Sequence, residues 1–219
     1  MILWRLAKLV LILACAGAPS VAFSAPRSPA TPEQIAAARA EADALIAATG
    51  APDLFVNTTD SEAPTVRHIP SNLTCTFNHA SPNNELVIGP DPIRGEYVAC
   101  RSQSAAMTLS VTATRIAPPA AESLRGVVEA RDLRATLSYP TPTQDLGPAV
   151  MLGKKPFGLA YAVSGDRQGD KAFGWIGVLN AHGWGFTQVI VTSNPVTSRM
   201  SGELLFKTML MRLSGSIPN

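Results

Sequence analysis

The fold is decided by residues 171–193, which read KAFGWIGVLNAHGWGFTQVIVTS. Two runs rich in β-branched and aromatic residues, 171–180 and 184–193, flank a short turn that ends in glycine, and this order predicts a β-hairpin. Apolar side chains occupy both faces of the hairpin, namely Phe173, Trp175 and Leu179 on one and Ile176 and Val178 on the other. We therefore expect a central position in a sheet that is covered on two sides.

Shorter segments of alternating polarity precede this hairpin. Turn clusters such as SPNNE and GPDPIRG separate them, which is typical of antiparallel strands. The expected strands are 54–58, 65–69, 73–77, 85–89, 96–101 and 107–116, and one more is expected at 157–164. The stretch PTPTQDLGP, residues 140–148, is expected to form a loop because it is rich in turn-forming residues.

Three helices are expected around these strands, near residues 32–49, 119–136 and 197–213. The first begins with a capping box made by Thr31 and Gln34. The last is amphipathic, and its apolar side carries Gly202, Phe206, Met209, Leu210 and Leu213. The order helix, strands, helix, strands, helix predicts an α+β fold with a mainly antiparallel sheet, built as a single domain over residues 32–219.

The first 24 residues differ in composition from the rest of the chain. Arg5 and Lys8 precede an apolar run, LVLILACAGA, and small residues follow it. This order predicts a signal peptide at 1–24 and a flexible linker at 25–31. An alternative is a lipid anchor, because the ILAC sequence that ends at Cys15 is similar to the bacterial lipobox, in which the cysteine carries the lipid.

The balance of charges argues against a nucleic-acid partner. The 219 residues include 18 Lys and Arg against 16 Asp and Glu, and removal of the two basic residues of the signal peptide makes these numbers equal. The remaining chain has no basic cluster with interleaved aromatic residues, so a phosphate backbone has no electrostatic partner. With 46% apolar and 16% charged residues, the chain belongs to the globular class and not to the disordered one.

Two cysteines, Cys75 and Cys100, remain after the signal peptide is removed. In an oxidising compartment we expect them to form a disulfide, which closes a loop worth about 3.5 kcal/mol in the chain-entropy model. The alternative is a metal site, since Cys75 and His79 have a plausible ligand spacing and His68 lies near them in sequence. Cys100 has no such companion, so the disulfide is favoured, and neither a metal nor a cofactor is expected.

No sequence motif of a known catalytic centre is present, including G-x-S-x-G, H-E-x-x-H and the phosphate-binding loops. A hydrolase could still assemble its residues in the fold. The candidates for such a site are His68, His79 and His182 with Ser71, Ser81 or Asp60. We expect a non-catalytic protein and keep the hydrolase as an alternative.

Four aromatic residues of the hairpin are candidates for the lining of a ligand pocket: Phe173, Trp175, Trp184 and Phe186. In a hairpin that is covered on both sides, aromatic side chains usually belong to the core instead. The two possibilities differ in whether a cavity opens beside the rings.

Two parts of the chain resemble known proteins. Residues 73–101, from LTCTF to GEYVACR, are similar to the cysteine-bearing segment of small exported proteobacterial proteins of unknown function. The last third, with Trp175, the hairpin, Asn194-Pro195 and the terminal helix, distantly resembles the Mog1/PsbP-like α/β sandwich. Neither resemblance assigns an activity or a functional residue.

These observations predict a periplasmic or secreted envelope protein that binds a protein or a small ligand. A membrane enters only in the alternative in which Cys15 is lipidated and the protein is a lipid-anchored assembly subunit.

Overall fold

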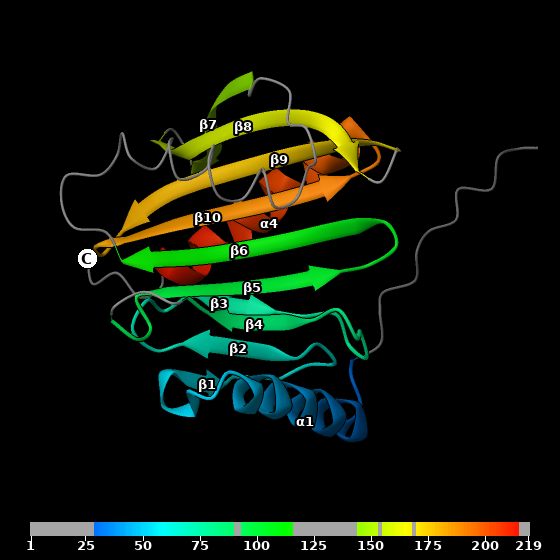
Figure 1. Ribbon diagram of the computed structural model, residues 1–219, viewed down its shortest axis with the longest axis vertical. Helices are drawn as coiled ribbons and strands as arrows, with labels where there is room; N and C mark the ends of the chain where they lie inside the picture. The colour runs from blue at the N-terminus through cyan, green and yellow to red at the C-terminus, as the bar shows by residue number, and fades with distance from the viewer. Residues whose placement is uncertain (1–28, 90–92, 116–143, 153–154, 168–169, 215–219) are drawn as a thin grey trace, which may run out of the picture.

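Two antiparallel sheets and two α-helices make up the part of the chain that the computed structural model describes, residues 29–89, 93–115, 144–152, 155–167 and 170–214 (Figure 1). The larger sheet has the order β4 (Glu85–Ile88), β5 (Tyr97–Gln103), β6 (Met107–Arg115), β10 (Trp184–Thr192), β9 (Asp170–Ala181), β8 (Lys155–Arg167) and β7 (Gln144–Leu152). The smaller one has the order β1 (Phe55–Asn57), β2 (Thr65–His68) and β3 (Thr74–Thr76). This is a single-domain α+β fold, as the sequence predicts.

The predicted hairpin is formed by β9 and β10 at the centre of the larger sheet. The strands pair from Trp184 opposite Ala181 to Thr192 opposite Phe173. His182 and Gly183 form the two-residue turn between them with positive φ angles of 52° and 74°, as a hairpin turn that follows the twist of the strands requires. Every residue of β10 is buried, which confirms the central position expected from its two apolar faces.

The last helix, α4 (Pro195–Ser214), lies across one face of the larger sheet, behind β9 and β10 in the view of Figure 1. Its buried side carries the residues expected from the sequence, Gly202, Phe206, Met209, Leu210 and Leu213. The rings of Phe206 and Trp175 meet edge to face with their centroids 5.5 Å apart. Helix and sheet are thus joined by aromatic as well as aliphatic contacts.

Two glycines allow α4 to approach this closely. A Cβ atom at Gly202 of the helix would overlap the Trp175 indole, and a Cβ at Gly177 of β9 would overlap both Trp175 and Phe206. The indole therefore fits between strand and helix because both positions lack a side chain.

The first helix, α1 (Pro32–Ala48), packs against the smaller sheet. Its capping box is formed: Thr31 Oγ1 accepts a hydrogen bond from the Gln34 amide, and Gln34 Oε1 accepts one from the Thr31 amide. The single-turn helix η1 (Pro52–Leu54) connects α1 to β1. Buried Ala38, Ala42 and Ile46 hold α1 on the sheet.

A disulfide between Cys75 of β3 and Cys100 of β5 joins the two sheets. The two Cα atoms are 6.0 Å apart, within the range that a disulfide spans. The predicted pairing is confirmed. The alternative in which Cys75 and His79 hold a metal is overturned, because the sulfur is bonded to Cys100.

The strand β7 departs from the expected loop at 140–148. It pairs with β8 at the edge of the sheet, with a register shift between Asp145 and Gly147, and Gly147 has a φ of 78°. Such bulges, and prolines such as Pro148, are tolerated at edge strands. The turn-forming residues that suggested a loop instead mark an irregular edge.

Several expected features lie outside the described residues: the helix at 119–136, the signal peptide at 1–24 with Cys15, and most of the linker at 25–31. Within the described ranges, neither helix combines the length and the apolar character needed to cross a bilayer.

We expect Gly202→Ala to lower the free energy of unfolding by about 1–3 kcal/mol, because the new methyl group overlaps the Trp175 ring. In an exposed helix the same change raises stability by about 1 kcal/mol. Urea unfolding measures the difference, and Ser201→Ala on the same helix is the matched control. A Gly202→Ala protein more stable than the parent would contradict this contact.

Candidate functional site

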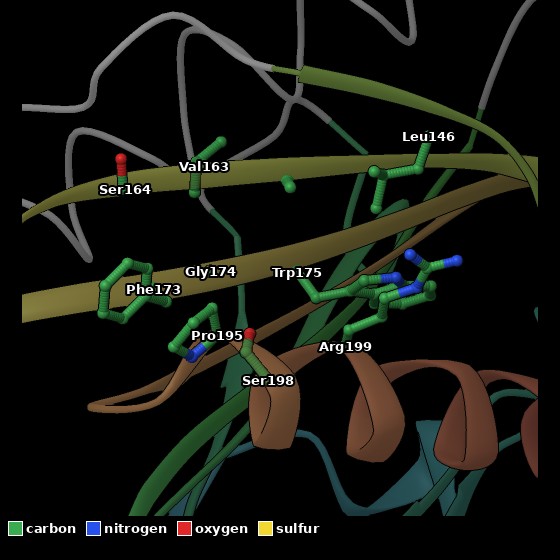
Figure 2. A pocket seen from close by; sticks show the side chains of 10 residues that line it. Leu146, Val163, Ser164, Phe173, Gly174, Trp175, Pro195, Ser198 and Arg199 are labelled. Carbon is green, nitrogen blue, oxygen red and sulfur yellow. The ribbon is translucent and has the colours of Figure 1, made fainter.

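A cavity of about 380 Å³ lies between β8, β9 and the first turns of α4 (Figure 2). Its apolar lining consists of Leu146, Ala162, Val163, Phe173, Trp175 and Pro195. Its polar lining consists of Ser164, Ser198 and Arg199, together with the backbone at Gly174. A mainly apolar cavity with a few polar groups is the usual form of a small-molecule site, and this volume falls in the usual range.

The central hairpin and α4 place the lining residues. Phe173 and Trp175 are two residues apart on β9, so both point to the face that α4 covers. In Figure 2, Phe173 and Pro195 lie toward one end of the cavity, and Leu146, Trp175 and Arg199 lie toward the other. The cavity thus has one end where Phe173 and Pro195 lie with the two serines Ser164 and Ser198, and another end that holds a cationic side chain.

The start of α4 forms part of the wall. Asn194 Oδ1 accepts hydrogen bonds from the amides of Val196 and Thr197 at 2.9 and 3.1 Å, and the Asn194 carbonyl accepts one from the Ser198 amide at 3.0 Å. The amides of the first turn are therefore satisfied within the protein. The helix still contributes the positive end of its dipole to this region.

The polar lining residues differ in their hydrogen bonds. The Ser198 hydroxyl donates to the Ile190 carbonyl at 3.4 Å, and Arg199 Nε donates to Glu203 Oε1 at 2.8 Å. Trp175 is 1% exposed, and its Nε1 has no hydrogen-bond partner among the described residues. A buried donor without a partner costs about 1–3 kcal/mol, so this indole is the unusual group of the cavity.

The four aromatic candidates separate into two pairs. Phe173 and Trp175 line the cavity, and Trp184 and Phe186 do not. Trp175 also belongs to the main core, together with Trp184 and Phe186. The register explains the separation, because Trp184 pairs next to the turn and Phe173 pairs with Thr192 at the opposite end of the hairpin. The four rings lie on the same face of the β9–β10 hairpin but at different positions along its strands.

The alternation of apolar and polar residues in the hairpin does not show that Arg199, Ser198 and Leu146 line the same cavity as Trp175. They come from α4 and from β7, the strand that the sequence did not predict. Asn194-Pro195 marks the start of the last helix in the sequence. It does not indicate which strands the start of that helix packs against.

A smaller cavity of about 190 Å³ lies beside the disulfide and α4. Its longest polar side chains on α4 and β10 are engaged: Arg212 Nη1 donates to Thr76 Oγ1 at 3.0 Å, and Gln188 Nε2 donates to the Gly202 carbonyl at 3.0 Å. It therefore offers less to a polar ligand than the larger cavity does.

One of the histidine and serine pairs considered for a hydrolase does form. His68 Nδ1 is hydrogen-bonded to Ser71 Oγ at 2.8 Å, and this oxygen also accepts from the Leu73 amide at 3.2 Å. His68 is 0% exposed and Ser71 5%, with the rings of Phe55 and Trp184 against the imidazole. A substrate cannot reach this pair without local opening, so we assign it to the stability of the β2 turn.

The other candidates are apart from this pair and are more exposed. His79 Nδ1 lies 2.9 Å from Glu41 Oε1 at the surface, and Ser81 Oγ donates to the Gln103 carbonyl at 3.3 Å. His182 is exposed in the hairpin turn and Asp60 in the loop after β1. In the described part of the chain, no group of three His, Cys, Asp or Glu side chains is arranged to hold a metal.

Desolvation by burial lowers the pKa of His68 to about 4. The imidazole is therefore neutral at pH 7, and a neutral buried ring fits its apolar surroundings.

Compared with known proteins, the chain matches no protein-family model and no curated protein. The geometry of the cavity and the chemistry of its lining are thus the basis for a proposal about function.

Burial of neutral His68 predicts a specific dependence of stability on pH. Between about pH 6.5 and 4 the unfolded chain binds a proton at this residue and the folded chain does not, so stability falls as the pH is lowered. We expect the His68→Gln protein to lose about 2.5 kcal/mol less than the parent between pH 7.5 and 4.5, as measured by urea unfolding.

The matched control is His182→Asn, at an exposed turn position that asparagine tolerates. It should keep the pH dependence of the parent. An NMR titration that places the His68 ring near pH 6.5 would overturn the assignment of a buried, neutral imidazole.

Proposed function

We propose that this chain is an exported, non-catalytic envelope protein, and that its α+β domain binds a small ligand in the cavity between β8, β9 and α4. One observation carries the proposal: a cavity of about 380 Å³ brings into one place two aromatic side chains, an arginine and a buried indole donor that has no partner among the described residues.

The lining supports binding because it is preorganised. The Trp175 ring is fixed between Gly177 and Gly202, so its surface is in place before a ligand arrives, and preorganised contacts add affinity by reducing the entropy lost on binding. Apolar surface provides most of the favourable free energy, and the few polar groups select the orientation.

Binding is favoured over hydrolysis by the position of the catalytic candidates. The His68 and Ser71 pair is sealed in the core, and the exposed imidazole of His79 is bonded to Glu41. Neither His68 nor His79 lines the cavity of about 380 Å³. A hydrolase needs a nucleophile and a base within reach of a bound substrate.

Export is supported by two independent features. The first 24 residues have the order of a signal peptide, and the Cys75–Cys100 disulfide is typical of oxidising compartments.

A cavity-filling variant tests the proposed binding. The probe is N-phenyl-1-naphthylamine, a neutral aromatic amine whose fluorescence rises in apolar surroundings. We expect saturable binding to the parent and an affinity at least about tenfold lower for Ala162→Leu, because the added carbons occupy the cavity. Ala36→Leu, at an exposed position of α1, is the control and should bind as the parent does. Equal affinity of the parent and Ala162→Leu would place the probe elsewhere and contradict the proposal.

Mass spectrometry of the N-terminus tests export after expression of the full chain in a Gram-negative host. We expect an unmodified chain that begins at Ala25 in the periplasm or the medium, since cleavage after Ser24 follows small residues. A chain that begins at a lipidated Cys15 would instead support the lipid-anchored alternative. A chain that keeps Met1 in the cytoplasm would contradict export in either form.

A further inference from the structure

The indole nitrogen of Trp175, which has no partner among the described residues, is buried and lies on the edge of the ring that neither glycine contacts. Gly202 approaches Cγ, Cδ2 and Cε3 of the ring, and Gly177 approaches Cζ3 and Cη2. These atoms form the edge of the ring away from Nε1. Because Trp175 also lines the cavity, a ligand acceptor reaches this buried donor once a neighbouring side chain of the lining shifts to open it. A buried polar group without a partner is rare enough in folded proteins to require such an explanation.

Arg199 supplies a second donor at the same end of the cavity (Figure 2). Its Nε donates to Glu203, and among the described residues no partner is seen for its two terminal nitrogens. The side chain is 63% exposed, so it can adjust to a bound group. Arg199 is also the only charged residue in the described lining of the cavity, which favours an anionic acceptor over a neutral one.

The number and kind of donors favour a carboxylate over a phosphate. Phosphate sites at helix starts depend on free backbone amides, and here Asn194 already occupies the amides of Val196, Thr197 and Ser198. Glu203 beside Arg199 would repel a dianion more strongly than a monoanion. One indole N–H and one arginine match the two oxygens and the single charge of a carboxylate.

The other end of the cavity selects the rest of the ligand. Phe173 and Pro195 lie there with the small hydroxyl side chains of Ser164 and Ser198 (Figure 2). The described lining holds no charged group at that end. A flat or branched hydrocarbon fits such a surface, because buried apolar area is stabilising and an unpaired polar group is not.

We infer that the cavity binds a small monocarboxylate with an aromatic or branched hydrocarbon body, whose carboxylate accepts hydrogen bonds from Trp175 Nε1 and Arg199. This inference rests on the proposed binding function and specifies its ligand class.

Isothermal titration calorimetry with three matched probes tests the ligand class: phenylacetate, its neutral amide phenylacetamide, and benzylphosphonate. We expect phenylacetate to bind the parent best. Arg199→Gln should weaken phenylacetate by about tenfold, a value between those of exposed and buried charge-assisted hydrogen bonds. Lys207→Gln, an exposed cation farther along α4, should leave its affinity unchanged.

Trp175→Phe separates the hydrogen bond from the apolar contact. Phenylalanine keeps a ring but lacks the N–H donor, so this change should weaken phenylacetate more than it weakens the neutral N-phenyl-1-naphthylamine. Thermal unfolding of each variant confirms that it remains folded at the temperature of the titration.

The outcomes distinguish the ligand class from the binding function. If phenylacetamide or benzylphosphonate binds as well as phenylacetate, and Ala162→Leu abolishes binding of all three, the cavity binds ligands but the carboxylate inference is wrong. The inference is also overturned if Arg199→Gln and Lys207→Gln have equal effects. If neither the carboxylate nor the naphthylamine binds the parent, the proposed function itself fails.

Discussion

The contact of the Trp175 indole with Gly177 of β9 and Gly202 of α4 determines the geometry of the candidate site. A side chain at either glycine would overlap the ring. The short distance between helix and sheet therefore requires that both positions lack a side chain. With α4 at this distance, Phe206 meets Trp175 edge to face, and the first turns of the helix stand beside β8 and β9 to enclose the cavity. The same ring therefore docks the helix and forms the wall of the site.

Two buried rings of this protein have a nitrogen without a hydrogen-bond partner among the described residues, Trp175 Nε1 and His68 Nε2, and their surroundings give them different roles. His68 is enclosed by the rings of Phe55 and Trp184, and burial keeps it neutral by lowering its pKa. Its free nitrogen belongs to a ring that stays uncharged, which is the form that burial favours. Trp175 borders a cavity that also contains Arg199, so a ligand can satisfy its donor.

Local sequence patterns predict the parts of the fold that depend on neighbouring residues. The alternation at 171–193 predicts β9 and β10, the capping box at Thr31 predicts the start of α1, and the spacing of apolar residues at 197–213 predicts the buried side of α4. The two cysteines that remain outside the expected signal peptide predict the disulfide. Periodicity does not predict β7, because an edge strand with a bulge has no regular pattern.

The candidate site is less accessible to sequence reasoning, because its residues meet only in three dimensions. Alternation identifies Phe173 and Trp175 as neighbours, but it also groups them with Trp184 and Phe186, which the register places toward the other end of the hairpin. Arg199 and Leu146 join the site through the packing of α4 and β7 on the sheet, and no local spacing encodes that packing.

The NMR signal of the Trp175 indole proton in ¹⁵N-labelled protein, assigned by its loss in Trp175→Phe, reports directly on this donor. We predict that saturation with phenylacetate moves this signal downfield and slows the exchange of the proton with solvent, since the proton enters a hydrogen bond to a carboxylate. Phenylacetate that binds while this signal stays unchanged would show that the ligand does not complete the indole donor.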